Sequence, residues 1–254
     1  MKLSANLGFL WTELPLADAI RAAARAGFDA VECHFPFDQD PDAVKAALAE
    51  TGLPMLGLNT VRGDLDAGEF GLAALPGRIE AARAAIDQAV GYAAQIGAQN
   101  VHVMAGKASG GNARATYAEN LAYAAEKASA HGIGLLIEPI NTRDVPGYHL
   151  HLAEDGAELI DRLGLPGLKL MFDCYHTQIM QGDLTRRIEA LLPVIGHIQI
   201  AGVPDRGEPD RGEVAFAALL PTIYGLGYTG YIGAEYKPSG KVEDGLGWMA
   251  ALPR

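Results

Sequence analysis

Several residue types that mark other protein classes are scarce in this chain of 254 residues. Its two cysteines, Cys33 and Cys174, are too few for a disulfide framework and lie far apart, at the ends of separate predicted strands, so we expect both to be reduced thiols. No apolar run reaches the ~18 residues that a membrane span needs. The N-terminal stretch also lacks the long uninterrupted apolar segment of a signal peptide. These absences predict a cytoplasmic protein with no membrane partner.

Positive charge is also in short supply. Lysine and arginine number 20 against 31 aspartates and glutamates, which gives a net charge of −11. A protein that binds nucleic acid through its phosphates needs a basic face. The composition therefore argues against a nucleic-acid partner and favours a small-molecule substrate.

What the chain does have is a repeated unit of a short apolar run, a loop and an alanine-rich helical stretch. The pattern predicts strands at 3–7, 29–33, 54–59, 100–104, 133–138, 168–173, 196–200 and 230–235. It predicts helices near 15–26, 40–51, 77–96, 114–131, 152–163, 183–192, 213–226 and 242–252. Most of these helices end at a glycine, which suits the left-handed residue that closes a helix. Such strict alternation of strands and helices indicates a parallel sheet.

The number of units selects the architecture of that sheet. Eight strand–helix units in a chain of this length match an α/β (β/α)8 TIM barrel, which typically takes about 250 residues. A nucleotide-binding open sheet would show G-x-G-x-x-G after an early strand, whereas GFLWTEL follows the first strand here. No linker interrupts the pattern, so we expect a single domain over residues 1–254.

Four consecutive predicted strands have a polar side chain that carries oxygen at or near their last residue. These are Glu138, Asp173, Gln199 and Glu235, each about one strand–helix unit after the last. The carboxyl ends of barrel strands meet at one face, where barrel enzymes place their chemistry. Buried carboxylates repel one another unless a cation compensates them, and a set of oxygen ligands suits Mg²⁺ or Mn²⁺. The alternative is that each acid forms a structural salt bridge with a nearby lysine or arginine.

Longer motifs occur around these positions: IEPIN at 137–141, FDCYH at 172–176, HIQIAGVPDRGEP at 197–209, GAEYKP at 233–238 and GDLDAGEFGLAALPGR at 63–78. They resemble the hydroxypyruvate isomerase family, whose wider relatives are xylose isomerase-like barrels and ketose 3-epimerases. The resemblance covers nearly the whole chain. It implies that Glu138, Asp173, Gln199 and Glu235 hold the metal and that Glu138 and Glu235 move protons, in an order that stays open.

The resemblance leaves two substrates open. Related epimerases usually have histidine where Gln199 stands, and the glutamine places this chain with the isomerases of smaller substrates. IEPIN and PGYHL (146–150) resemble hydroxypyruvate isomerase, whereas NVHVMAG (100–106) and AGVPDRGEPD (201–210) resemble isomerases of 2-oxo-tetronates. We expect conversion of hydroxypyruvate to 2-hydroxy-3-oxopropanoate through an enediolate, with 2-oxo-tetronate isomerisation as the alternative.

A substrate that carries a carboxylate needs cationic or hydrogen-bonding partners. His176, three residues after Asp173, and Arg206, in the loop after Gln199, are the first candidates. Lys237 and Lys107 are further candidates. The structural alternatives are a helix-capping histidine, a solvated loop arginine and lysines held in ion pairs.

Three other functions share parts of this pattern. A ketose 3-epimerase would use the same ligands and proton chemistry on a neutral sugar. Some barrels of the wider superfamily are endonucleases that use several metals and many histidines, whereas only His176 and His197 of the seven histidines lie in the acid-bearing motifs. A non-catalytic sugar-acid binding protein would need the pocket without two proton-transferring acids.

The resemblance to the wider superfamily also suggests that the chain forms a homo-oligomer.

Overall fold

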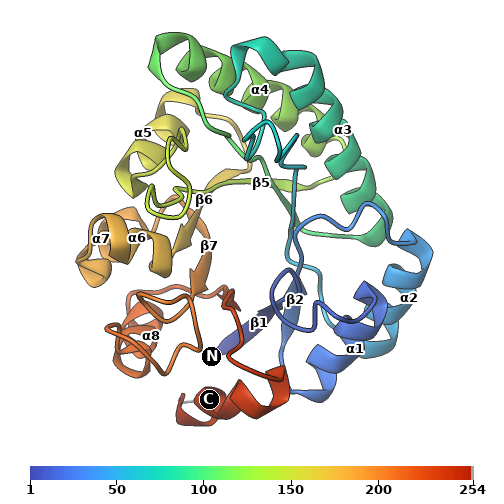
Figure 1. Cartoon of the computed structure of the whole chain (residues 1–254), viewed down its shortest axis with the longest axis vertical. Helices are drawn as coiled ribbons and strands as arrows, with labels where there is room; N and C mark the ends of the chain where they lie inside the picture. Colours follow the sequence, from blue (N-terminus) through green and yellow to red (C-terminus); the bar gives the residue numbers. More distant parts are fainter. Residues whose placement is uncertain (253–254) are drawn as a thin grey trace.

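Eight parallel strands form the centre of the molecule in the computed structural model, which describes residues 1–252 (Figure 1). Their order in the sheet is β2-β1-β8-β7-β6-β5-β4-β3. The strands are β1 (Lys2–Asn6), β2 (Ala30–Glu32), β3 (Leu58–Asn59), β4 (Asn100–His102), β5 (Gly134–Ile137), β6 (Leu168–Asp173), β7 (Ile195–Ile200) and β8 (Tyr231–Ala234). This arrangement confirms the predicted TIM barrel.

The barrel is nearly closed between β2 and β3, which share no continuous ladder. The segment before β3 bridges this gap, because Val31 N–H donates to the Pro54 carbonyl at 3.0 Å and Leu56 N–H to the Val31 carbonyl at 2.7 Å. The strand predicted at 54–59 is regular only at its last two residues. Pro54 has no N–H to donate and Gly57 has no side chain to pack, and both weaken a regular strand.

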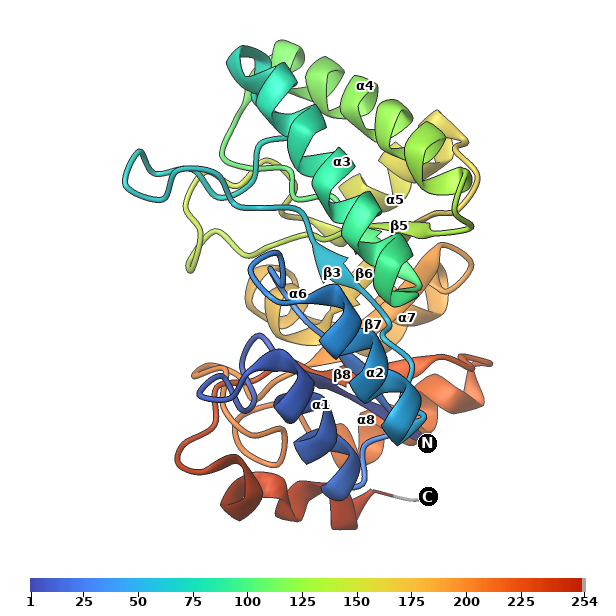
Figure 2. The ribbon, with the colours of Figure 1, turned by 90° about the vertical axis from the view of Figure 1, so that its right-hand side faces the viewer.

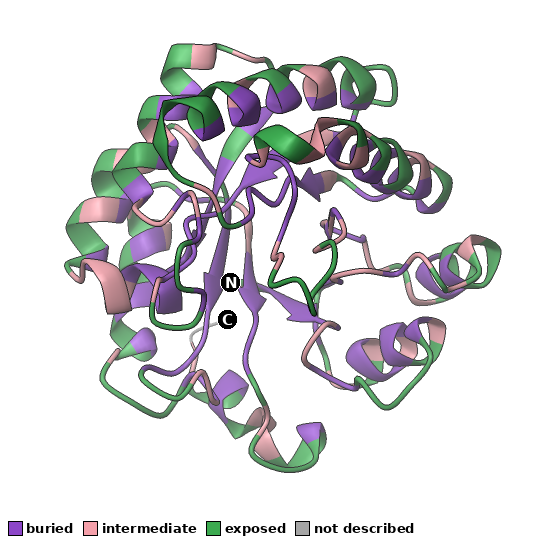
Figure 3. Ribbon diagram, turned by 45° about the horizontal axis from the view of Figure 1, so that its top comes forward, coloured by how far each residue is buried: buried purple, intermediate pink, exposed green. Residues whose placement is uncertain are grey.

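Helices surround the strands on the outside of the barrel (Figures 1 and 2). They are α1 (Leu16–Arg25), α2 (Pro41–Thr51), α3 (Ile79–Ile96), α4 (Gly110–Ser129), α5 (Ala153–Leu163), α6 (Cys174–Met180), α7 (Leu184–Leu191) and α8 (Phe216–Gly225). The strands and the inner helix faces are buried, while the outer helix faces are exposed (Figure 3). Within residues 1–252, no helix combines the length and apolar character required to cross a membrane.

Three elements differ from the sequence expectation. The last predicted helix is a 3₁₀ helix, η2 (Val242–Ala251), and a short 3₁₀ turn, η1 (Pro76–Arg78), precedes α3. Helix α6 was not predicted. It begins directly after β6 because the Asp173 carboxylate accepts a hydrogen bond from Tyr175 N–H at 2.6 Å and so caps the helix.

Candidate active site

A cavity of about 460 Å³ opens where the strands reach their carboxyl ends. Glu138 follows the last residue of β5, and Glu235 follows the last residue of β8. Both line the cavity, together with His176 from α6 and Arg206 from the loop after β7. Side chains that are far apart in sequence therefore converge at the end of the barrel where the sequence predicts them.

Three of the four predicted ligands present a buried oxygen that lacks a partner in the described part of the chain. These atoms are Glu138 Oε1, Asp173 Oδ2 and Gln199 Oε1. Asp173 and Gln199 are direct neighbours in the register of β6 and β7. The other Asp173 oxygen is used to cap α6. Buried polar atoms are normally hydrogen-bonded, so a group of oxygens without partners fits a site that a cation completes.

The fourth predicted ligand, Glu235, is held by protein groups. Asn6 Nδ2 donates to its Oε1 at 3.0 Å, and His34 Nε2 lies 2.9 Å from the same oxygen. Arg206 Nη2 donates to Oε2 at 2.5 Å. Burial alone would raise the pKa of Glu235, but Arg206 and the His34 hydrogen bond outweigh burial and lower it. Glu235 is therefore an ionised carboxylate in a fixed orientation.

In Glu138 and Asp173 the charged form of the carboxyl group is destabilised. Burial, followed by the charges of Glu235 and Asp173, raises the pKa of Glu138 well above its ordinary value. Burial raises the pKa of Asp173 to about 7, although Arg206 partly offsets the effect. A divalent cation would relieve this repulsion. The donor set and its electrostatics therefore fit the predicted metal.

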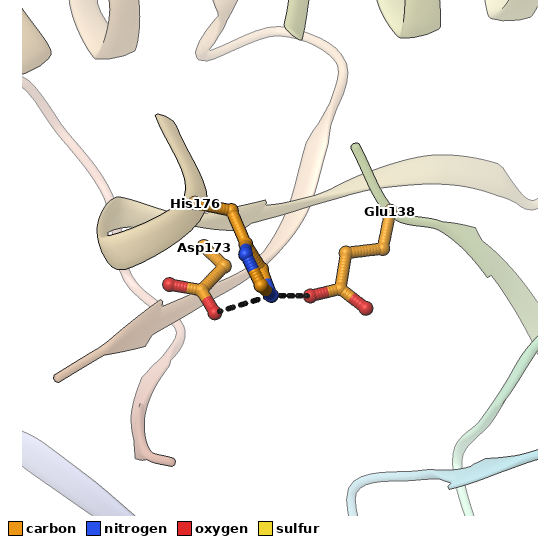
Figure 4. Close-up of side chains that lie close together, drawn as sticks. All are labelled: Glu138, Asp173 and His176. Atoms are coloured by element: carbon orange, nitrogen blue, oxygen red, sulfur yellow. Dashed lines mark ion pairs between the residues drawn. The ribbon is translucent and has the colours of Figure 1, made fainter. Parts of the chain in front are cut away.

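His176 lies between two of the carboxylates (Figure 4). Its Nε2 is 3.6 Å from both Glu138 Oε1 and Asp173 Oδ2. Its Nδ1 accepts from the backbone N–H of Asn141 at 3.3 Å and lies 2.6 Å from Asn141 Nδ2. Burial and Arg206 lower the pKa of His176 to about 3, so the ring is neutral with its proton on Nε2. Although the three side chains are close enough to surround an ion, His176 offers a hydrogen where a ligand needs a lone pair.

Arg206 is tied to the acids of the site. Besides its bond to Glu235, Nη2 lies 3.6 Å from Asp173 Oδ2, and the guanidinium stacks on the rings of Phe9 and Tyr175. Its backbone adopts the left-handed conformation, with φ of 57°, which is uncommon outside glycine and often marks a functional position. The backbone N–H of Lys237 donates to the Arg206 carbonyl at 2.7 Å and helps to hold this loop.

The two lysines predicted to contact substrate lie apart from the other candidates. Lys107 and Lys237 are exposed, and neither side chain lines the cavity formed by the described residues. Lys237 contributes its backbone rather than its charge. In contrast, the cavity wall includes Arg62, and Asn141 orients His176, although neither residue was predicted. The available sequence signals were the position of Arg62 just before GDLDAGEF and that of Asn141 in IEPIN.

Comparison with known proteins gives one family match and three likenesses that cover nearly the whole chain. A model of the family described as xylose isomerase-like TIM barrel matches residues 20–252. A 2-oxo-tetronate isomerase of Cupriavidus necator is 46% identical over 252 residues, covering 98% of this chain and 97% of that protein. A hydroxypyruvate isomerase of Escherichia coli is 40% identical and covers 98% of both chains. A crystal structure from Brucella melitensis, described as an AP endonuclease of family 2, has a TM-score of 0.93 and 41% identity, covering 98% of both chains.

Proposed function

The chain belongs to the xylose isomerase-like TIM barrel family and is an isomerase, and we propose that it interconverts hydroxypyruvate and 2-hydroxy-3-oxopropanoate with the aid of Mg²⁺ or Mn²⁺. Relatives that are 40% and 46% identical over almost the whole chain bear the names of isomerases of small hydroxy-oxo acids. The two buried free cysteines are consistent with the reducing cytoplasm expected from the sequence.

One observation supports the proposed dependence on a metal: buried oxygens of Glu138, Asp173 and Gln199 lack a hydrogen-bond partner among the described residues. These three residues and Glu235 would hold the ion. A bound divalent cation supplies a Lewis acid that stabilises negative charge developing on the substrate oxygens. The oxygen-only donor set supports Mg²⁺ or Mn²⁺ rather than a softer ion.

The reaction requires two proton movements on neighbouring carbons. In hydroxypyruvate, C3 loses a proton and C2 gains one, while the hydroxyl hydrogen passes from the C3 oxygen to the C2 oxygen. Glu138 and Glu235 come from β5 and β8, the outer strands of the four, and line the same cavity, so they are suited to take and return the carbon-bound proton. His176 directs its Nε2 hydrogen into the same space and is suited to donate to a substrate oxygen.

A second candidate substrate is a four-carbon 2-oxo-tetronate. The relative that carries this name is 46% identical to the chain, compared with 40% for the Escherichia coli hydroxypyruvate isomerase. Both acids place a carboxylate beside the reacting hydroxy-ketone and require the same proton transfer. The same site can therefore serve either acid.

A paired turnover assay tests the proposal. Protein treated with EDTA is assayed with hydroxypyruvate and with a 2-oxo-tetronate, before and after addition of Mg²⁺ or Mn²⁺. We expect metal-dependent isomerisation of at least one acid. A neutral ketose tests for 3-epimerase activity, and a DNA duplex with an abasic site tests for the nuclease activity named for the Brucella structure. Turnover of the ketose or cleavage of the DNA, without turnover of either acid, would overturn the proposal.

Substitution of the acids separates an enzyme from a binding protein. Glu138→Gln and Glu235→Gln should each abolish detectable turnover. Glu158→Gln, on the exposed surface of α5, is the matched control and should leave turnover unchanged. If the protein binds the acids but does not convert them, and neither Gln variant alters more than affinity, the chain is a binding protein.

A further inference from the structure

Arg62 occupies the wall of the cavity that contains Glu138 and Glu235. It lies three residues after β3, and its carbonyl accepts a hydrogen bond from Gly71 N–H at 2.8 Å. Its guanidinium lies 4.8 Å from the centre of the Phe35 ring and 5.6 Å from that of Phe70. The two aromatic rings and the backbone hydrogen bond to Gly71 therefore hold the charged group at the cavity.

The charge of Arg62 has no counterpart in the described part of the protein. No carboxylate lies within ion-pair distance of its guanidinium, and its side chain makes no hydrogen bond there. Arg206 differs, because Glu235 and Asp173 already neutralise it. Stacking on aromatic rings leaves the edge N–H groups of a guanidinium free to bind a planar anion.

The charge balance of the site points in the same direction. Once a divalent ion is bound, that ion and Arg206 together balance the carboxylates of Glu138, Asp173 and Glu235. The carboxylate of an acid substrate would then remain without an opposite charge. Arg62 is a cation in the same cavity, and its own charge is unmatched.

We propose that Arg62 binds the carboxylate of the substrate and so determines the specificity of this site for hydroxy-oxo acids over neutral sugars. This assignment rests on the proposed isomerase function and extends it. It also replaces Arg206 as the carboxylate-binding residue: Arg206 orients the acids of the protein, and Arg62 orients the acid of the substrate. A guanidinium and a carboxylate can form two parallel hydrogen bonds, which fixes the orientation of the reacting carbons.

The test compares an acid with its neutral counterpart. Dihydroxyacetone has the hydroxy-ketone of hydroxypyruvate but a hydroxymethyl group in place of the carboxylate. We expect Arg62→Gln to raise KM for hydroxypyruvate about 10- to 100-fold, as loss of hydrogen bonds to a charged group implies. The kcat/KM for dihydroxyacetone should stay within about twofold, because no carboxylate is present. Arg62→Lys should recover part of the loss, and Arg186→Gln, on the exposed surface of α7, controls for the change in net charge.

The outcomes distinguish this inference from the proposed function. An equal loss on the acid and on dihydroxyacetone, or an unchanged KM for the acid, would overturn the role of Arg62. If the wild-type protein converts no acid, calorimetric titration of the Mn²⁺-loaded protein with hydroxypyruvate decides: binding that weakens in Arg62→Gln preserves the carboxylate site although the reaction fails. Absence of binding, or binding that Arg62→Gln leaves unchanged, overturns it. If Arg62→Gln does not fold, the same comparison is made with Arg62→Lys.

Discussion

The backbone N–H of Asn141 donates to Nδ1 of His176, and this bond decides which ring nitrogen carries the proton. A backbone N–H can only donate, so Nδ1 must accept and the hydrogen of the neutral ring lies on Nε2. Nε2 lies 3.6 Å from an oxygen of Glu138 and from an oxygen of Asp173, too far for a hydrogen bond, so its hydrogen is free for a substrate oxygen. His176 is therefore a hydrogen-bond donor at the site, even though its position beside two acids resembles that of a metal ligand.

The first prediction separates these two roles of His176. His176→Gln should lower kcat/KM about 100-fold, the loss typical for a donor that stabilises charge in the transition state. Affinity for Mn²⁺ should change by no more than about threefold. Asp173→Asn is the comparison and should weaken Mn²⁺ binding at least about tenfold, because it removes a proposed ligand charge. Steady-state kinetics and Mn²⁺ titration measure both effects, and equal losses of Mn²⁺ affinity in the two variants would make His176 a ligand.

Substitution of Arg206 should lower turnover without weakening the binding of the metal. Its Nη2 bonds to Glu235 at 2.5 Å and lies 3.6 Å from Asp173. Arg206→Gln releases Glu235 from this orientation, so turnover should fall about 100-fold. The same substitution removes a positive charge from beside the cation site, so Mn²⁺ should bind as tightly as before or more tightly. Arg211→Gln, an exposed position in the same loop, should change neither quantity; weaker Mn²⁺ binding in Arg206→Gln would contradict this account.

The barrel, and the end of it at which the acids lie, could be predicted because both follow from short-range patterns in the sequence. A strand that ends on Glu138 and another that ends on Asp173 must present these side chains at the same end of a parallel barrel. Helix α6 was missed because Asp173 serves two purposes. One of its oxygens caps the helix and the other faces the site, and the sequence suggested only the second role.

The partners of the charged loop residues could not be predicted in this way. Three of these residues follow the ends of strands: Arg206, Lys237 and Lys107. The sequence alone does not show whether each side chain points into the cavity or into solvent. In the structure Arg206 turns inward through a left-handed backbone, whereas the lysine side chains are exposed. Arg62 was missed because its position just before GDLDAGEF does not reveal that two rings from other parts of the chain, Phe35 and Phe70, hold its guanidinium. Such contacts arise only when loops from different strands are packed together.

Glu208 provides a pH-dependent prediction away from the proposed ligands. It is 2% exposed, and its Oε1 accepts from both the backbone N–H and the hydroxyl of Ser239 at 2.8 Å. Burial would raise its pKa, but the Ser239 bonds and Arg211 outweigh burial and lower the pKa below the usual 4.5. Its stabilising contribution is therefore complete above pH 4.5 and is lost as the pH falls through the folded-state pKa.

Glu208→Gln should accordingly lower the free energy of unfolding by about 1–2 kcal/mol at pH 7, because it weakens hydrogen bonds to a charged group. The difference from the wild type should shrink as the pH falls below 4.5, where the wild-type carboxyl also gains a proton. Urea unfolding of both proteins across this range measures the effect. A difference that is constant with pH would show that the charge of Glu208 is not responsible.

Gly233 tests how tightly the interior beneath the site is packed. A Cβ at this position would lie 2.3 Å from Glu32 Oε1, 2.8 Å from His197 Nε2 and 2.9 Å from Gln199 Cγ. Glu32 and His197 are paired at 2.6 Å inside the barrel and cannot move apart without breaking that bond. Gly233→Ala should therefore destabilise the protein by about 1–3 kcal/mol through overpacking. It should also weaken Mn²⁺ binding by displacing Gln199.

Gly91 is the matched control for this substitution. It lies within α3, and a Cβ there would meet no atom within 4 Å apart from the adjacent backbone of its own helix. Gly91→Ala should stabilise the protein by about 0.5–1 kcal/mol, because alanine loses less backbone freedom than glycine when a helix forms. Thermal unfolding and Mn²⁺ titration of both variants should give opposite changes in stability, and a change in metal affinity only for Gly233→Ala. If a folded Gly233→Ala protein binds Mn²⁺ with unchanged affinity, then packing against residue 233 does not position Gln199, and Gln199 does not help to bind the ion.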